Sequence, residues 1–269
     1  MDDSSEKNLE IITRAGGDPT LKLPGVELRK LAVGRGGKEG FSTGTATFAA
    51  GAALPCHTHT FSEIITVLDG ECRFIVEGRT YLLRRHDTMH VPPGVPHHGS
   101  NARKDIPLLA HWTYTTTLPS LAKCETPFQH RDLEVPPTGA PEQLVRFGKA
   151  EKYELAAGTK FCDLFGARTG CPDICGGYGE FAPGTGLPCH THEFDESINI
   201  IRGSAVCMVA GRRHELTNCD TAMVPQGQPH RFLNESRDTM AMIWVYARGE
   251  ASRTIVDAAY CTGERCMPC

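Results

Sequence analysis

The chain has 269 residues, of which 40% are hydrophobic, and a formal net charge of −4 at pH 7. Basic residues form no cluster longer than pairs such as Arg84–Arg85 and Arg212–Arg213, which argues against nucleic-acid binding, and no run of 18 apolar residues could span a membrane. The first ten residues are acidic and polar and lack the apolar region of a secretion signal, so we expect a cytoplasmic protein.

The first half of the chain predicts an all-β domain. Residues 1–25 are polar and interrupted by glycine and proline, so we expect an arm there. Strand-like runs then follow from 26 to 118, including VELRKLAVG, FSTGTATFAAG, a hairpin that turns at Glu77–Gly78, and the closing run IPLLAHWTYTTT. Helical periodicity is nearly absent, and the clearest short helix candidate covers Leu118 to Lys123.

The second half repeats this organisation after a connection. Residues 119–145 hold five of the 18 prolines and predict a linker. Residues 146–250 again predict β-strands, with a hairpin at Gly211 and a last strand in TMAMIWVYAR. Residues 251–269 form a cysteine-rich tail.

One motif occurs twice and organises the whole chain. The first copy, GAALPCHTHTFSEIITVLDG, runs from Gly51 to Gly70, and the second, GTGLPCHTHEFDESINIIRG, runs from Gly184 to Gly203. Each copy is followed by a proline-glycine or proline-glutamine-glycine turn and a further histidine, in PPGVPHHGSN and PQGQPHRFLN. All correspondences share an offset of 133 residues, which indicates a tandem duplication and two domains.

The residue types in the motif predict a metal site in each domain. Side chains two apart on a strand share a face, so both histidines of His-Thr-His point the same way. Three imidazoles and one carboxylate suit a divalent first-row metal and leave coordination positions open for substrate or dioxygen. Mn, Fe, Co, Ni, Cu and Zn all remain possible metals. The predicted ligands are His57, His59, Glu63 and His97 in the first domain and His190, His192, Glu196 and His230 in the second.

These spacings resemble the paired signature motifs of the cupin superfamily. The chain is similar to a bicupin, which implies two tandem jelly-roll-like β-barrels related by internal duplication. In such proteins the two barrels are arranged like a fused dimer, so a strand of one barrel can complete the sheet of the other. One departure is that His86 and Cys219 occupy the position where the second motif usually has glycine; we expect this to affect a turn and not a ligand.

Residues near the ligands predict a mostly apolar chamber for a small molecule. The candidate substrate-binding residues are Phe61, Ile65 and Gly99 in the first barrel and Phe194, Ile198 and Phe232 in the second. Gly99 stands where the second barrel has Phe232, so we expect the first barrel to be roomier and to bind the substrate. His90 is a candidate catalytic residue, because a histidine close to the ligands can donate or carry a proton near neutral pH.

The 12 cysteines are expected to be free thiols in a cytoplasmic protein. Cys56 and Cys189 each precede a predicted ligand, and alternation turns them away from the metal, which indicates packing residues. A zinc site built from tail cysteines and either Cys171 or Cys175 is a less favoured alternative to incidental thiols.

Three functions fit this sequence. The first is a metal-dependent dioxygenase, an oxidoreductase acting on a small enolic, diketone or phenolic substrate, as the resemblance implies for many metal-bearing cupins. The second is a redox-neutral isomerase, lyase or decarboxylase in which the metal is a Lewis acid and His90 or Asp195 moves a proton. The third is a non-enzymatic binding module. The expected partner is a small-molecule substrate, and the protein is expected to be a monomer or a homodimer.

Overall fold

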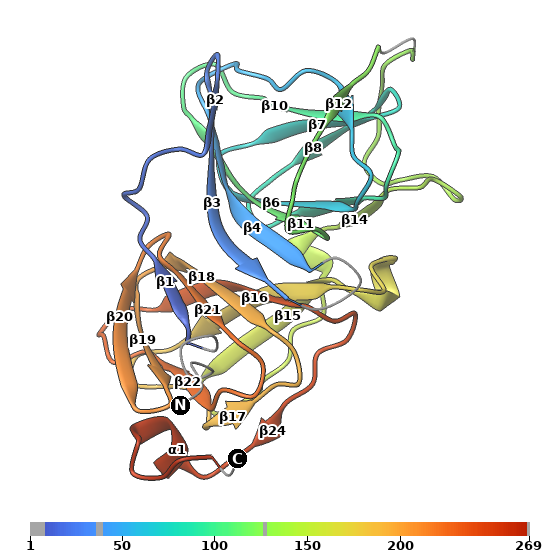
Figure 1. Ribbon diagram of the computed structural model, residues 1–269. Helices are drawn as coiled ribbons and strands as arrows, with labels where there is room; N and C mark the ends of the chain where they lie inside the picture. The colour runs from blue at the N-terminus through green and yellow to red at the C-terminus, as the bar shows by residue number, and fades with distance from the viewer. Residues whose placement is uncertain (1–8, 36–39, 126–127, 268–269) are drawn as a thin grey trace, which may run out of the picture.

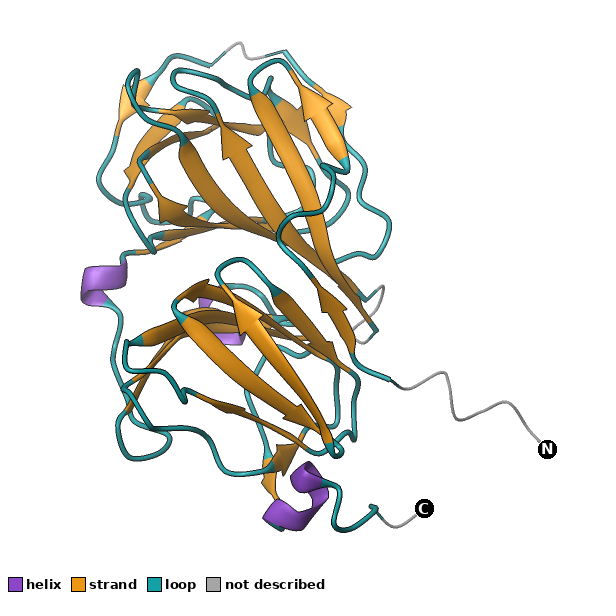
Figure 2. Ribbon diagram, turned by 90° about the vertical axis from the view of Figure 1, so that its left-hand side faces the viewer, coloured by secondary structure: helices purple, strands orange, loops and turns teal. Residues whose placement is uncertain are grey.

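The computed structural model describes residues 9–35, 40–125 and 128–267, and it is almost entirely β-structure. Two barrels lie one above the other (Figures 1 and 2), each built from two facing sheets. None of the described helices is long and apolar enough to cross a membrane.

Barrel 1 is a seven-stranded sheet packed against a six-stranded sheet. The first sheet has the order β14-β9-β6-β11-β4-β3-β2 and the second β12-β5-β10-β7-β8-β13. The strands are β2 (Leu21–Leu23), β3 (Val26–Gly34), β4 (Phe41–Phe48), β5 (His57–Thr58), β6 (Glu63–Asp69), β7 (Cys72–Val76), β8 (Arg79–Leu83), β9 (Thr88–Val91), β10 (His97–Asn101), β11 (Leu108–Tyr114), β12 (Ala122–Lys123), β13 (Arg131–Asp132) and β14 (Gln143–Val145).

Barrel 2 repeats the plan with sheets of six and five strands, in the orders β1-β21-β18-β23-β16-β15 and β20-β19-β22-β17-β24. The strands are β1 (Ile11–Thr13), β15 (Thr159–Phe165), β16 (Cys175–Phe181), β17 (His190–Thr191), β18 (Glu196–Arg202), β19 (Ser204–Val209), β20 (Arg212–Thr217), β21 (Thr221–Val224), β22 (His230–Leu233), β23 (Met240–Tyr246) and β24 (Thr254–Ile255). Short helices lie at Phe147–Lys149, Ala167–Thr169 and, as α1, Ala258–Thr262.

The first strand of each repeat pairs with a strand of the barrel that is formed by the other repeat. Strand β1, from the predicted arm, pairs with β21 of barrel 2, and β14, from the predicted linker, pairs with β9 of barrel 1. Figure 1 shows the chain passing from β1 beside β21 up to β2 and β3 in the other barrel. The expectation that a strand of one barrel completes the sheet of the other is therefore confirmed. The arm and the linker also contribute ordered strands, which their composition did not predict.

The two predicted hairpins are present. Glu77–Gly78 and Ala210–Gly211 both have positive φ angles, 47° and 80° in the first and 44° and 84° in the second. Two consecutive positive φ angles match the twist of the strands that a two-residue turn must join. His86 and Cys219 also have a φ of 66°, which explains why glycine suits that position. The short helix expected at Leu118 to Lys123 is absent, since β12 occupies its end.

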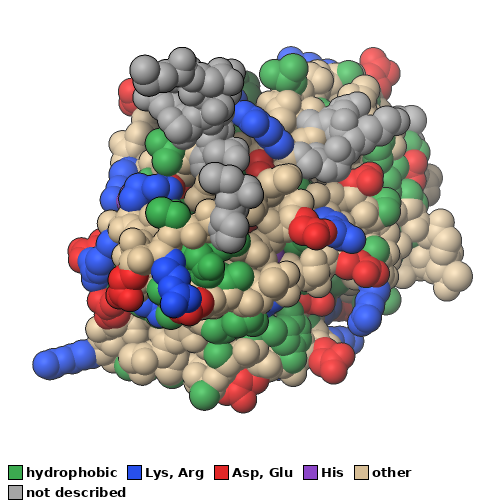
Figure 3. Space-filling model, turned by 60° about the horizontal axis from the view of Figure 1, so that its bottom comes forward, with side chains coloured by type: hydrophobic (Ala, Val, Ile, Leu, Met, Phe, Trp, Pro, Cys, Tyr) green, Lys and Arg blue, Asp and Glu red, His purple; other side chains and the backbone are tan. Residues whose placement is uncertain are grey.

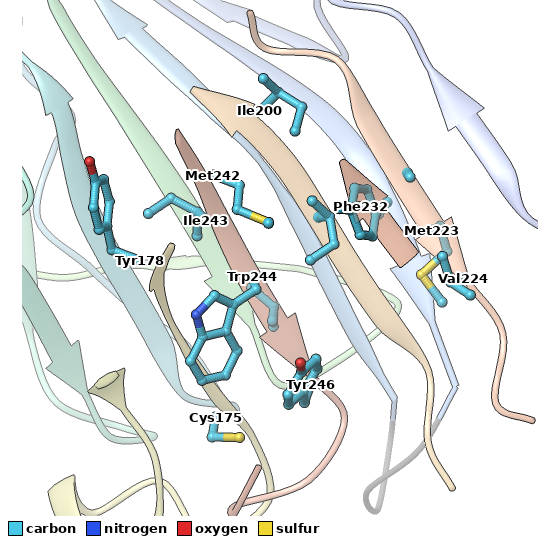
Figure 4. Packing of buried hydrophobic residues seen from close by; sticks show 14 of the residues in the cluster. Cys175, Tyr178, Ile200, Met223, Val224, Phe232, Met242, Ile243, Trp244 and Tyr246 are labelled. Carbon is cyan, nitrogen blue, oxygen red and sulfur yellow. The ribbon is translucent and has the colours of Figure 1, made fainter. Parts of the chain in front are cut away.

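The barrels meet through the outer faces of their larger sheets. Thr43 of β4 lies 3.2 Å from Ser197 of β18, hydroxyl oxygen to hydroxyl oxygen. Ile64 and Phe41 of barrel 1 belong to the same buried cluster as the core of barrel 2, so apolar packing continues across the junction. Successive side chains of β23 point to opposite faces of the sheet (Figure 4). Ile243 points toward Tyr178 on the junction side, whereas Met242 points to the other side.

Candidate metal centres

In barrel 1 the motif gathers four donors at one point inside the barrel. His57 and His59 flank Thr58 around β5, Glu63 begins β6, and His97 begins β10. All four side chains are buried, and their ligand atoms lie within 4.8 Å of one another. The carboxylate oxygen Oε2 of Glu63 lies 2.6 Å from Nε2 of His97, 2.9 Å from Nε2 of His59 and 3.8 Å from Nε2 of His57.

The second copy builds the same cluster in barrel 2. His190, His192, Glu196 and His230 are buried, and their ligand atoms also lie within 4.8 Å of one another. Nε2 of His230 lies 2.6 Å from Oε2 of Glu196, and Nε2 of His192 lies 3.5 Å from it. Figure 4 places Tyr246 and Phe232 in the same barrel, on strands β23 and β22.

Backbone carbonyls fix the orientation of all six imidazoles. In barrel 1 the Nδ1 atoms of His57, His59 and His97 lie 2.8, 2.6 and 2.8 Å from the carbonyl oxygens of Pro55, Ser120 and Val95. In barrel 2 those of His190, His192 and His230 lie 2.8, 2.5 and 2.8 Å from the carbonyl oxygens of Pro188, Ser252 and Gln228.

A carbonyl only accepts, so each Nδ1 carries a proton and each Nε2 faces the centre, where it can offer a lone pair to a metal once its own proton is lost. This is the tautomer that a metal requires. Nε2 of His192 is moreover buried with no hydrogen-bond partner among the described residues, as expected of an atom that serves a metal. The donors present therefore fit a divalent transition metal in each barrel.

The charge of the carboxylate is compatible with this role. Burial alone would raise the pKa of Glu63, but His97, His57 and His59 outweigh it and hold that pKa well below its usual range. The pKa of Glu196 is lowered in the same way by His230 and His192 against the effect of burial. Both carboxylates are therefore anionic ligands at neutral pH.

A small cavity adjoins the ligands of barrel 1. Its volume is about 20 Å³, and it borders His57, Glu63 and His97. That is room for about one water molecule. The remaining wall is mostly apolar and includes Ile65, Cys72, Phe74, Gly99, Ala110 and Tyr114. No lysine or arginine is among the described residues that line it.

Several comparisons with known proteins agree with this architecture. A family model described as "Cupin domain" matches the chain twice, over residues 44–114 and 177–246. The chain belongs to the cupin family. It carries the domain twice and is a bicupin with one His3Glu metal site in each barrel. No curated protein matches its sequence.

Among solved structures this bicupin is similar to oxalate decarboxylases. For the enzyme of Lactobacillus farciminis in complex with formate, the TM-score is 0.73 at 13% identity, covering 93% of this chain and 88% of the other. For the enzyme of Bacillus subtilis at pH 4.6, the TM-score is 0.71 at 14% identity, covering 93% and 78%. At such identities the likeness shows the fold.

Two predicted substrate residues, Ile65 and Gly99, line the cavity. Phe61 instead stacks on the ligand His59, with ring centroids 4.7 Å apart, and its counterpart Phe194 stacks on His192 at 5.0 Å. Ile198 and Phe232 are buried in barrel 2. The phenylalanines beside the histidines therefore support the ligands from outside the cavity.

The exchange of Gly99 for Phe232 is offset by a second exchange on the neighbouring strand. Gly99 of β10 is paired with Phe74 of β7, whereas the corresponding Phe232 of β22 is paired with Cys207 of β19. Each barrel therefore has one aromatic ring in this residue pair, on β7 in the first barrel and on β22 in the second. A Cβ atom at Gly99 would lie 3.5 Å from the Phe74 ring. The barrels also differ at Ala110 and Leu28, which correspond to Met242 and Phe161 in the second barrel, and at Ala46 between them, which corresponds to Gly179.

The placement of His90 contradicts its predicted role beside the metal. In the β6–β9 pair, Glu63 is opposite Val91 and Ile64 is opposite His90, so His90 shares the outer face with Ile64. It lies near Gly170 at the barrel junction, and burial lowers its pKa to about 4. Asp195 is likewise occupied elsewhere, because it accepts the backbone N–H groups of Gln226 and Arg35.

Tyr114 and Cys72 are proton-bearing side chains of the cavity that the sequence analysis missed. Burial, followed by the negative charge of Glu63, raises the pKa of Tyr114 well above 10, and burial raises that of Cys72 to about 12. Both groups therefore remain protonated at neutral pH. Tyr246 holds the corresponding place in barrel 2. Tyr114 could have been identified from the sequence, because residues two apart on a strand share a face and Tyr114 is two residues after Trp112 on the last strand.

The cysteines also differ from expectation. Cys189 and Cys261 form a disulfide, which contradicts free thiols at these positions and removes Cys261 from a zinc site. Cys171 and Cys175 are buried in the core of barrel 2, and Cys269 lies outside the described residues.

Proposed function

We propose that this bicupin is a metal-dependent, redox-neutral enzyme, a lyase or decarboxylase, and that barrel 1 is its catalytic chamber. The observation that carries the proposal is the cavity of barrel 1, which the ligands His57, Glu63 and His97 line together with Tyr114, whose phenol is protonated, and with apolar side chains. A chamber of this kind can bind a small acid at the metal and deliver a proton to it.

The residues of the chamber would have three roles: metal binding, proton donation and exclusion of water. A bound divalent metal would supply a Lewis acid that holds a carboxylate or enolate oxygen of the substrate. The three carbonyl-bound imidazoles keep their Nε2 atoms in place, so the site needs little rearrangement. Tyr114 donates a proton to the carbon or oxygen that becomes electron-rich as the bond breaks, and the apolar wall excludes water.

The lining of the chamber favours a monoanionic substrate with an apolar body. Oxalate, which the similar solved structures act on by name, would carry two negative charges. The described wall of the cavity offers Glu63 as a charged ligand and no cationic side chain to a second carboxylate. We therefore infer that a 2-oxo or 3-oxo monocarboxylic acid suits this chamber better than a dicarboxylate.

A dioxygenase is the second candidate, because an apolar chamber next to an open metal position also admits dioxygen. The deciding experiment loads the purified protein with Mn, Fe, Co, Ni, Cu or Zn in turn. It then records carbon dioxide release and oxygen uptake on a panel of oxo acids, diketones and catechols, with and without air. Carbon dioxide release that persists without air supports the proposal, and turnover that requires oxygen would replace it with the dioxygenase. Binding without turnover in every case would favour a non-enzymatic module.

A further inference from the structure

Cys56 and Cys124 lie opposite each other at one end of the β5–β12 pair, beside the metal site of barrel 1. The backbone N–H of Cys124 donates to the carbonyl oxygen of Cys56 at 3.1 Å, and the next residues, His57 and Lys123, are paired in register. Residues paired in this way have Cα atoms about 5.5 Å apart, which is inside the range that a disulfide spans.

The two thiols are adjacent and partly accessible. The backbone hydrogen bond from Cys124 to Cys56 holds the two residues next to each other. Both cysteines are free, and both are intermediate in exposure, whereas most other free cysteines are buried. They are therefore a reduced pair that a small oxidant can reach.

The duplication provides an internal comparison. Cys189 precedes His190 as Cys56 precedes His57, and its carbonyl oxygen accepts the N–H of Val256 at 2.9 Å, as that of Cys56 accepts Cys124. Cys189 is bonded to Cys261 of helix α1. The ligand strand of barrel 2 is thus tied covalently to the chain that follows it, and the ligand strand of barrel 1 is not.

The segment that a Cys56–Cys124 bond would tie down covers the metal site. We call residues 118–124 the strap. The carbonyl oxygen of Ser120 in the strap lies 2.6 Å from Nδ1 of the ligand His59, and among the described strands β12 pairs with β5 alone. Leu118 is 83% exposed and Leu121 is 45% exposed, so few apolar contacts hold the strap.

A substrate can enter the chamber only if part of the surrounding protein moves, and the strap is a candidate for that movement. The cavity of about 20 Å³ holds about one water molecule, so an acid of several heavy atoms needs a part of the wall to move. A surface pocket of about 440 Å³ lies against His59, Gly94, Ser120 and Leu121. Ser120 and Leu121 of the strap therefore line the surface pocket next to the ligand His59, and movement of the strap would expose this side of the metal site.

We propose that Cys56 and Cys124 form a reversible disulfide that locks the strap over barrel 1. For its effect on catalysis this inference rests on the proposed function, but the bond and the locking do not. The oxidant is a peroxide or a small disulfide. With hydrogen peroxide, one thiol becomes a sulfenic acid and releases water, and the second thiol displaces a second water to form the S–S bond. Two thiols lose two electrons and two protons, and the peroxide is reduced to two waters.

The bond can be detected by peptide mapping. Cleavage after glutamate gives peptides 40–63 and 78–125, which contain Cys56 and Cys124 as their single cysteines. The metal-loaded full chain is treated with hydrogen peroxide, alkylated and digested without reduction. We expect the two peptides linked after oxidation and separate after dithiothreitol. If oxidation leaves them unlinked while the Cys189–Cys261 peptides are found joined, the inference is overturned.

Locking is measured independently of activity by amide hydrogen exchange. Oxidation should slow exchange in the strap about tenfold and reversibly, because opening then requires a closed loop to move as a whole. The matched control is Cys124→Val, which introduces the residue of the second barrel, Val256, and keeps Cys56. Unchanged strap exchange in the oxidised wild type, or equal slowing in the variant, would refute the locking.

The catalytic effect is tested last. Turnover of the oxidised wild type should fall about tenfold and recover with dithiothreitol, with metal content unchanged, whereas Cys124→Val should keep its rate. If no substrate is turned over, the proposed function fails, and the cross-link and exchange data still decide the inference. If turnover exists and is the same in both redox states, the strap does not control access.

Discussion

Nη1 of Arg14 lies 2.9 Å from Oδ2 of Asp220, although the two residues are 206 positions apart. Arg146 and Asp87 form the same pair at 2.7 Å, and in both cases the next backbone N–H, of Ala15 or Phe147, donates to the other carboxylate oxygen at 3.0 Å. Each pair fastens the first strand of one repeat to the opposite barrel, so the two halves hold each other together.

A second pair of contacts extends this symmetry. Glu10 accepts hydrogen bonds from Arg212 and lies 2.6 Å from His214, and Glu142 accepts from Arg79 and Tyr81. The pattern Glu-x-x-x-Arg thus occurs at 10–14 and at 142–146, with an offset of 132 residues. The repeat therefore includes parts of the predicted arm and the predicted linker.

The two arginines should differ in their effect on stability. The side chain of Arg146 is 14% exposed and that of Arg14 is 57% exposed, whereas both aspartates are buried. Arg146→Ala leaves Asp87 without its buried cation, and we expect it to lower the free energy of unfolding by about 3 kcal/mol. The matched Arg14→Ala should cost about 1 kcal/mol or less. Urea denaturation of the metal-loaded proteins measures both, and equal losses would contradict the argument.

Metal content should follow the two clusters separately. The wild type is expected to bind two ions per chain, and His59→Ala or His192→Ala to bind one, because losing one of four donors weakens a site by about 100-fold or more. Elemental analysis after dialysis provides the measurement, and the double variant should bind none. A single variant that keeps both ions would show that its histidine is not a ligand.

Filling the cavity of barrel 1 should lower turnover strongly without removing metal. Ala110→Met copies the residue of barrel 2, Met242, into the space beside the ligands. We expect turnover to fall by about 100-fold while metal content and fold are kept, since the side chain blocks the open coordination position. The reverse exchange, Met242→Ala, opens barrel 2 and should not reduce turnover. Full activity in Ala110→Met would place the reaction elsewhere.

Tyr114→Phe tests the proton donor. Removing one hydroxyl should lower kcat by about 100-fold with little change in metal content. Tyr246→Phe is the matched control in barrel 2, where we expect a small effect. Since the pKa of Tyr114 is raised well above 10, the wild-type rate should show no loss from phenol ionisation up to pH 9. A variant as active as the wild type would remove Tyr114 from the mechanism.

Acid sensitivity should depend on His111 at the barrel junction. Burial lowers its pKa to about 3, whereas an unfolded histidine has a pKa of about 6.5, so the unfolded state binds the proton first. Stability is therefore lost as the pH falls below 6.5, and the loss from this residue reaches about 2 kcal/mol at pH 5.

His111→Ile installs the residue of barrel 2, Ile243, and should make the stability difference between pH 7.5 and pH 5 smaller by that amount. The two proteins differ at this residue alone, so the comparison isolates His111. An unaltered slope in His111→Ile would contradict the argument.

The electrostatic surface agrees with a small-molecule enzyme. Figure 3 shows basic and acidic side chains interspersed over one face, and the described residues pair many of them, as in Arg213 with Glu215 and Glu235. This mixture offers no extended basic field on that face to a nucleic acid.

The sequence by itself determined the duplication, the two-barrel fold and both ligand sets. Alternation on a strand and a fixed offset are local properties, so His57, His59 and their counterparts follow from spacing alone. Glu63 and His97 could be added because the motif occurs twice and chance cannot repeat such a pattern.

Only the tertiary structure decided which side chains share a space. The outward face of His90, the exchange of an aromatic ring between Phe74 and Phe232, and the position of Tyr114 depend on the register between strands that are distant in sequence. The crossing of β1 and β14 and the Cys189–Cys261 bond arise in the same way. A periodic pattern fixes which way a side chain faces along its own strand, but packing between strands fixes what it faces.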